Sequence, residues 1–166
     1  LVLKLYYDRN VYPYEFRFLV QGTEKPIADP VTGSARYQAR VTQGAKEVPG
    51  YTLVLGTTNP QTIDIVAEEG NTAVNNVKTF YYVEDTVDIK YEVVGPDGCG
   101  TLDNYQNNTV KVVDGTPEGS TPTASAGFKF VGWYKDKDCT QLVDAAWIEN
   151  NKIIPQKTAD LGNNVK

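Results

Sequence analysis

The sequence of 166 residues contains no histidine and no methionine, and it has only two cysteines. Without histidine, the chain cannot assemble a Ser-His-Asp or Cys-His nucleophile system from its own residues. Imidazole-based zinc sites are excluded for the same reason, and two thiolates are too few to complete a zinc cage. Apolar runs such as Phe18-Leu19-Val20 are far shorter than the roughly 20 residues that span a bilayer. We therefore expect no histidine-dependent enzyme and no membrane span in this fragment.

Positive charge is also scarce. Lysine and arginine total 16 against 21 acidic residues, which gives a net charge of −5, and all arginines lie before residue 41. An acidic chain without a basic cluster is not typical of nucleic-acid binding. No glycine-rich phosphate loop occurs, and Gly95–Gly100 contains a proline that is typical of a tight turn. These absences favour a non-enzymatic binding or structural module without a cofactor.

What the chain does contain is typical of a folded protein. Hydrophobic residues make up 40% and charged residues 22% of the sequence. The length fits one ordinary domain or two small ones. The sequence does not begin with methionine, which is typical of a piece excised from a longer protein.

A weak internal repeat occurs at a shift of 75 residues. Tyr6-Tyr7 matches Tyr81-Tyr82, and each pair is followed by a polar joint and a strand that alternates apolar and polar residues. These two strands cover residues 14–20 and 89–93. The repeat predicts tandem modules at residues 11–85 and 86–166, with a boundary near Glu84-Asp85-Thr86 and a short first segment, residues 1–10.

The rest of the pattern is rich in strands, so the expected fold class is mostly β or α+β. Further strands are expected at Arg36–Val41, Tyr51–Leu55, Gln61–Val66, Val77–Val83, Thr109–Val113 and Phe128–Tyr134. Helix signals are limited to one turn at Gln43–Val48 and a short helix at Gln141–Glu149. Two independent cores are expected, the first from Phe16, Phe18, Tyr37, Tyr51, Leu53, Ile65 and Tyr81. The second would contain Ile89, Tyr91, Val112, Phe128, Phe130 and Trp133.

The first module resembles the mucin-binding protein (MucBP) domain family of Gram-positive surface proteins. The resemblance rests on Thr32-Gly33-Ser34-Ala35-Arg36-Tyr37, on Lys46–Val54 with its Pro-Gly-Tyr-Thr-Leu core, and on Phe80-Tyr81-Tyr82. The second module resembles the Listeria–Bacteroides repeat, also called the internalin B-repeat, through Ala126–Tyr134. That family closes with an aromatic strand, which this sequence lacks at its end.

Both resemblances imply small β-grasp-like modules repeated in tandem along wall-attached bacterial proteins. They imply a non-enzymatic stalk or adhesin segment that is extracellular and attached to the cell wall. The alternative is a dedicated carbohydrate- or mucin-binding module with an aromatic glycan site, whose partner would be host mucin or another glycan.

Two cysteines and several aromatic residues are the candidate site residues. In an exported protein, Cys99 and Cys139 are expected to form a disulfide that stabilises the second module by roughly 4 kcal/mol. Most of the 11 tyrosines, 5 phenylalanines and 2 tryptophans are expected to be structural. The remaining candidates for stacking on a sugar are Tyr6, Tyr12, Tyr82 and Trp147.

Other chemistry is less favoured by the sequence, and no metal site is expected. The acidic pairs Asp136/Asp138 and Asp85/Asp88 lack the Asp-x-Asp-x-Asp-Gly pattern of a calcium loop. Lys4, Lys78, Lys90 and Lys111 lie on expected strands and could enter an isopeptide bond, but they fall at outward positions of the alternation.

The ends of the sequence carry the last expectation. Leu1–Tyr7 alternates like a strand, and the repeat equates it with the closing strand of the first module. We expect it to be the closing strand of a preceding repeat, and to pair with the incomplete second module of a neighbouring molecule, head to tail.

Overall fold

The computed structural model of the chain describes residues 1–155. The fold is mostly β, as predicted, with short helical structure at one 3₁₀ turn among the described residues. The chain divides into two compact units, Leu1–Val83 (unit 1) and Glu84–Lys166 (unit 2). Within the described part, no helix is long and apolar enough to cross a membrane.

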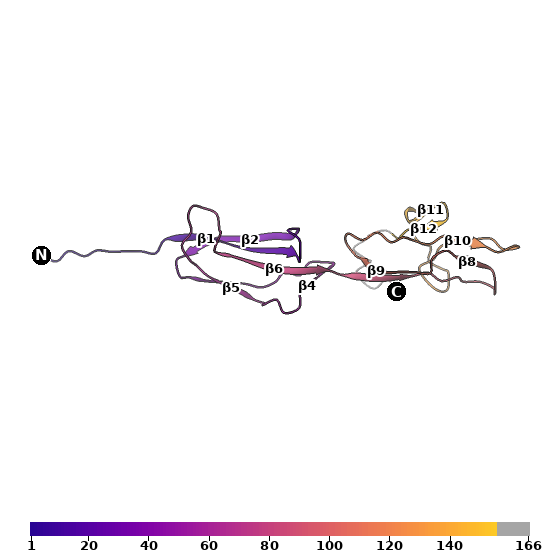
Figure 1. The fold of residues 1–166 in the computed structure, drawn as a ribbon, viewed down its shortest axis with the longest axis horizontal. Coiled ribbons are helices and arrows are strands. Elements are labelled where there is room, and N and C mark those ends of the chain that lie inside the picture. The colour runs from indigo at the N-terminus through magenta and orange to yellow at the C-terminus, as the bar shows by residue number, and fades with distance from the viewer. Residues whose placement is uncertain (156–166) are drawn as a thin grey trace. The chain divides into compact units, whose positions relative to one another are not determined.

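Unit 1 is built on a four-stranded sheet in the order β2-β1-β6-β4 (Figure 1). β1 (Val11–Val20) pairs antiparallel with β2 (Pro26–Arg36) and parallel with β6 (Val77–Glu84), while β4 (Tyr51–Leu53) lies at the edge. A separate antiparallel pair is formed by β3 (Arg40–Gln43) and β5 (Gln61–Asp64).

The core of unit 1 follows from the alternation of its strands. Phe16 and Phe18 on β1 are buried, and the ring of Phe18 stacks on that of Phe80 at 5.3 Å between centroids. The buried residues that pack together are Phe16, Phe18, Ile63, Ile65, Phe80 and Tyr82. Tyr37 and Tyr81, which the sequence placed in this core, are exposed. On β6, Phe80 and Tyr82 occupy the inner face, so Tyr81 between them points outward, contrary to the prediction.

Unit 2 contains short strand pairs. β7 (Thr86–Lys90) pairs with β9 (Gln106–Lys111), β8 (Gly100–Leu102) with β10 (Pro122–Ala124), and β11 (Ile148–Glu149) with β12 (Lys152–Ile153). The central cluster is small and consists of Tyr91, Trp133 and Ile153. Ile89 and Phe130 pack against it, whereas Phe128 is exposed, contrary to the expected core.

The repeat seen in the sequence is also a repeat in structure. In unit 1, Val11 pairs with Arg36. In unit 2, Thr86 pairs with Lys111, and both partners lie 75 positions further along the chain. The hydrogen bond that precedes each first strand is shifted by the same number: Tyr37 donates to the carbonyl of Asn10 at 2.8 Å, and Val112 to that of Asp85 at 3.0 Å.

Some expected elements are not formed. Phe128–Tyr134 is not a strand within the described residues, and only Tyr134 makes an isolated bridge, to Leu142. Trp133 turns inward and donates its indole N–H to the carbonyl of Asn151. The expected strand Arg36–Val41 is interrupted at Gln38, which has a φ of 63°.

The two expected helices differ as well. Residues 43–48 contain no helix. β3 extends to Gln43, and Val48 makes an isolated bridge to Tyr51. The expected helix Gln141–Glu149 reduces to the 3₁₀ turn η1 (Ala145–Trp147), which Asp144 caps by accepting from the N–H of Ala146. Ile148 ends it early, because it enters β11 and pairs with Ile153.

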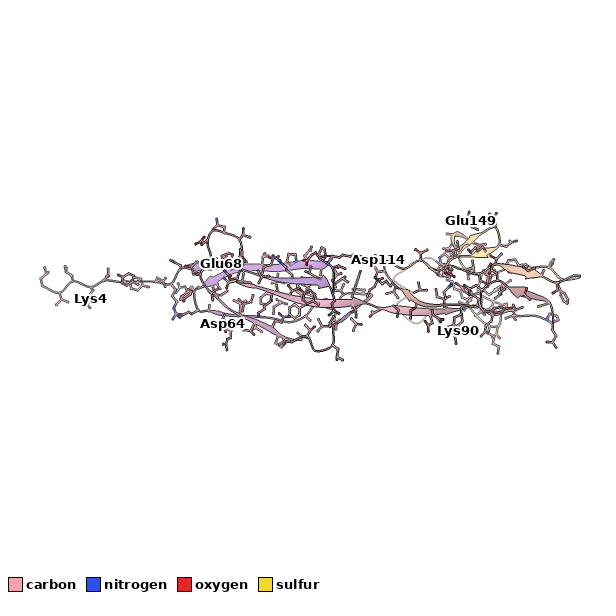
Figure 2. All side chains as sticks on the ribbon, viewed as in Figure 1. Lys4, Asp64, Glu68, Lys90, Asp114 and Glu149 are labelled. Carbon is pink, nitrogen blue, oxygen red and sulfur yellow. The ribbon has the colours of Figure 1, made fainter. Side chains whose placement is uncertain are left out.

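The predicted strand Leu1–Tyr7 is also absent. Residues 1–10 are exposed and belong to no strand, and Figure 2 shows Lys4 on a segment outside the sheet of unit 1. A lone strand leaves its backbone groups to water, so it forms only beside a partner. The structure describes one chain, so pairing with a neighbouring molecule stays a prediction. The expected lack of a closing strand in the second module falls on residues 156–166, outside the described residues.

Candidate functional site

An open hollow of about 1410 Å³ lies in unit 2 beside β7. Its walls come from β7 and the residues after it, and from the segment around Trp133. The apolar side chains along it include Ile89, Tyr91, Val93, Phe130, Trp133 and Val143. We call it the β7 hollow.

The aromatic wall of the β7 hollow is centred on Trp133. The rings of Tyr91 and Phe130 lie 6.0 and 5.9 Å from it, both edge to face. The indole N–H donates to the carbonyl of Asn151 at 2.8 Å. Asn150 and Asn151 both adopt positive φ, so the turn between β11 and β12 presents this carbonyl to the indole. Trp133 is therefore fixed in position rather than free to rotate.

Tyr91 is held at its hydroxyl. The hydroxyl donates to Oδ1 of buried Asn107 at 2.7 Å, and the same oxygen accepts from the N–H of Gly119 at 3.1 Å. Burial raises the pKa of Tyr91 to about 12. The hydroxyl is thus a neutral, occupied donor near neutral pH, and its role is structural.

The corresponding place in unit 1 is filled by β6. There, residues 15–20 pair in parallel with residues 77–82, and β6 brings Phe80 and Tyr82 into the core. The equivalent residues in unit 2 are 90–95. Of these, residues 92–95 are exposed and belong to no strand, with Val93 and Val94 at 42% and 57% exposure. Residues 92–95, which follow β7 and line the β7 hollow, are therefore not covered by a strand that corresponds to β6.

The four expected sugar-stacking residues lie in different surroundings within their own units. Tyr6 is exposed at 84%, and Tyr12 packs edge to face on Tyr37. Tyr82 is buried at 2% and donates its hydroxyl to the carbonyl of Lys46, so its ring is packed in the core of unit 1 in this structure. Trp147 belongs to unit 2, where Nζ of Lys135 lies 5.6 Å from its ring centroid.

The structure describes Cys99 and Cys139 as free thiols, and the expected disulfide between them stays a prediction. Each sulfur is engaged in its own turn. Sγ of Cys99 lies against Gly95, where it fills the space that a side chain at that glycine would need. Sγ of Cys139 lies 3.8 Å from the carbonyl of Lys137. The sequence separation of the two cysteines carried no information on these directions.

One residue of each acidic pair, Asp136 or Asp88, accepts hydrogen bonds from backbone N–H groups. Asp136 accepts hydrogen bonds from the hydroxyl and N–H of Thr140 and from the N–H of Gln141. The hydroxyl of Thr140 contributes most to lowering the pKa of Asp136. Asp88 accepts from the N–H of Thr109. In the part of the chain that the structure describes, no three acidic or thiol side chains gather as a metal site would require.

The lysines that were weighed for an isopeptide bond, and disfavoured as outward-facing, are all exposed. This holds for Lys4, Lys78, Lys90 and Lys111. Nζ of Lys111 lies 4.0 Å from a carboxylate oxygen of Glu84.

The sequence reasoning missed two residues that organise unit 1. Buried Asn76 joins three segments, since its amide donates to the carbonyls of Pro13 and Val66 and accepts from the N–H of Val66. Glu68 accepts from the N–H groups of Val74, Asn75 and Asn76. Their only signal in the sequence is a polar stretch before an apolar strand, which is equally typical of a solvated turn.

Comparison with protein-family models, with curated proteins and with solved structures finds no match to this chain.

Proposed function

We propose that this chain is a non-enzymatic spacer segment of a bacterial cell-surface protein that carries tension between an anchored end and an adhesive part. The resemblance of its two halves to repeats of wall-attached proteins supports the extracellular location. The geometry of unit 1 supports the mechanical role, and one observation carries it: the parallel pairing of β1 with β6.

The chain enters the sheet of unit 1 at the start of β1 and leaves it at the end of β6. These strands pair in parallel over six consecutive positions, from Glu15↔Val77 to Val20↔Tyr82. Because they are parallel, the entry and exit points lie at opposite ends of the pair. Tension between these points therefore loads the hydrogen bonds together, in shear, instead of breaking them one after another.

Side-chain packing reinforces this pair. Phe18 and Phe80 face each other in the register and stack almost parallel, with 4° between their planes. Sliding β1 past β6 would have to separate these buried rings as well as the hydrogen bonds. β6 ends at Glu84 and β7 begins at Thr86, so tension passes into unit 2 through a single intervening residue.

Single-molecule pulling in two directions tests the proposal. Handles attached through Asn10→Cys and Asp85→Cys load the β1–β6 pair in shear. Handles at Asn10→Cys and Val74→Cys load the same pair from one end, so that it opens like a zipper. Both variants carry Cys99→Ser and Cys139→Ser, which restricts attachment to the introduced thiols.

We expect a clearly higher unfolding force in the first direction, because forced unfolding depends on the barrier along the loaded path. Equal unfolding forces in the two directions would contradict the spacer proposal. A chemical denaturation curve of each variant, measured without force, checks that both retain the same stability.

A further inference from the structure

In unit 2, no strand occupies the position that β6 occupies in unit 1, among the residues that the structure describes. β1 is covered on one side by β2 and on the other by β6. β7 pairs with β9, and the pairs of Thr86 and Val87 repeat the register of β1 with β2, before a register shift of one residue between Val87 and Ile89. On the side that corresponds to β6, residues 92–95 have no strand partner among the described residues, and the apolar β7 hollow lies there.

The chain's own equivalent of β6 is engaged elsewhere. β12 begins at Lys152, which is 75 positions after Val77, but it pairs with β11 and bridges Ser120. The sequence beyond it does not suit the inner face either. Pro155 stands where unit 1 has Phe80, and Lys157 stands where it has Tyr82. Proline has no N–H for a strand ladder, and lysine is a poor core residue.

Another segment of the chain does suit this position. Residues 2–9 stand 75 positions before β6, and they place Leu5 at the position of Phe80 and Tyr7 at that of Tyr82. Leu1, Leu3, Leu5 and Tyr7 are 79–114% exposed, so this apolar row has no cover within its own unit. Contiguous exposed apolar surface of this kind is typical of an interaction site.

We propose that Leu1–Tyr7 of one molecule adds as a parallel strand to residues 90–95 of a second copy of this chain. The register follows from that of β1 and β6: Val2 lies opposite Lys90, Leu5 opposite Val93, and Tyr7 opposite Gly95. Leu5 and Tyr7 then enter the β7 hollow, against the wall formed by Tyr91 and Trp133. Addition of a strand to a free edge satisfies the backbone groups of both segments.

Charge agrees with this register. Lys4 takes the position of Thr79, which lies opposite Arg17 in unit 1. The residue equivalent to Arg17 in unit 2 is Glu92, so Lys4 of one molecule lies opposite Glu92 of the next. Opposite charges at directly facing positions stabilise a strand pair. A shift of one residue would remove this pairing and would also turn Leu5 away from the hollow.

The contact is head to tail, because donor and acceptor are different surfaces. Such a contact leaves a free donor on one molecule and a free acceptor on the other, so association continues beyond the dimer. Analytical ultracentrifugation of the 166-residue chain should show mass that rises with concentration. Deletion of residues 1–7 should abolish the rise, and unchanged association of that variant would overturn the proposal.

Matched variants test the register. The double variant Leu5→Asp/Tyr7→Asp changes the two side chains that enter the β7 hollow. The double variant Val2→Asp/Tyr6→Asp changes two side chains on the opposite face of the same strand. We expect the first pair to weaken association at least about tenfold more than the second. Equal weakening would indicate unspecific adhesion and would overturn the assignment. Residues 1–10 are exposed, so neither pair is expected to unfold unit 1.

A charge exchange gives an independent measurement. Lys4→Glu and Glu92→Lys should each weaken association, and the chain that carries both changes should recover it. Failure to recover would overturn the register. A chain that ends at Pro155 provides the last control, and we expect it to associate like the full chain. If association appeared only in that shorter chain, the chain's own residues 156–166 would be the occupant of the edge, and the proposed second copy would be wrong.

Discussion

Asn76 shows how one buried amide can determine where several segments of a unit meet. Its Nδ2 donates to the carbonyl of Pro13 at 3.1 Å and to that of Val66 at 2.9 Å, while its Oδ1 accepts from the N–H of Val66. The side chain is fully buried. Both donors of Nδ2 and one acceptor site of Oδ1 therefore hold β1 and the segment after β5 beside the start of β6.

We predict that Asn76→Ala lowers the free energy of unfolding of unit 1 by about 2–4 kcal/mol, because it leaves buried backbone groups without partners. Asn75→Ala is the matched control. Asn75 is exposed, and its side chain donates to Glu68, so a change within about 1 kcal/mol is expected. Chemical denaturation followed by far-UV circular dichroism measures both. Similar losses in the two variants would contradict the role assigned to Asn76.

Tyr91 gives unit 2 a dependence on alkaline pH. Burial raises its pKa from 10.0 to about 12, so the folded unit keeps the phenol proton at a pH where the unfolded chain loses it. Its stabilising contribution is complete below pH 10 and is lost as the pH rises towards 12. We predict that the thermal midpoint of unit 2, followed by tryptophan fluorescence, falls more steeply over this interval than in Tyr91→Phe.

The stability of Tyr91→Phe relative to wild type at neutral pH provides the reference for this pH dependence. Tyr91→Phe removes the hydrogen bond to Asn107 and should cost unit 2 about 1 kcal/mol at pH 7. If wild type and variant showed parallel midpoints from pH 9 upward, Tyr91 would not be the titrating group.

The strands differ in how far their sequences determine them. β1 and β6 are long, and each buries one face, so their alternation predicts them well. β2 was missed over most of its length, because Asp29-Pro30 is typical of a turn, yet the strand continues through it at the sheet edge. Phe128–Tyr134 has equally good alternation, but no neighbouring strand accepts it. Alternation predicts a strand only where a partner is also present.

Many loops of unit 2 are determined by carboxylates rather than by periodicity. Glu84 accepts from the N–H groups of Val113 and Asp114, and Asp103 accepts from the N–H of Thr121. Each of these bonds joins residues far apart in the sequence. No local pattern announces such a partner, which explains why β8 and β10 were not predicted.

Alanine substitutions at two glycines, Gly119 and Gly127, distinguish the cost of a steric clash from the cost of backbone strain. Gly119 has a φ of 80°, and a Cβ at this position would lie 2.1 Å from the backbone oxygen of Ile153. Gly127 has a φ of 86° with open space around it. Gly127→Ala should cost unit 2 about 1 kcal/mol through strain alone. Gly119→Ala should cost about 2 kcal/mol more, because it also displaces the strand bridge between Ser120 and Ile153. Equal losses on chemical denaturation would show that this bridge is unimportant.

The candidate site was only partly predictable. Tyr91, Phe130 and Trp133 were assigned to the second core, and all three pack together there. The sequence does not show that these three residues border an open hollow. Whether the hollow is open depends on whether another strand covers the residues after β7.

Both tryptophans lie in unit 2, which allows the units to be followed separately. Phe16 is completely buried in unit 1, and we predict that Phe16→Ala costs that unit about 3–5 kcal/mol. Tryptophan fluorescence should then report an unchanged denaturation midpoint, while the circular dichroism transition moves to lower denaturant. Tyr81→Ala, on the outer face of β6, is the control. A shifted fluorescence midpoint would show that the two units unfold as one.

The hydrogen bonds at Asn10 and Asp85 have a consequence for how such chains can change length during evolution. Each residue immediately precedes the first strand of its unit, and each carbonyl accepts from the residue 27 positions later, Tyr37 or Val112. A crossover that joins one of these positions to the other removes or duplicates a whole unit and leaves the joint bonded as before. Genes for chains of this type can therefore gain or lose repeats by unequal recombination without creating a hybrid fold at the junction.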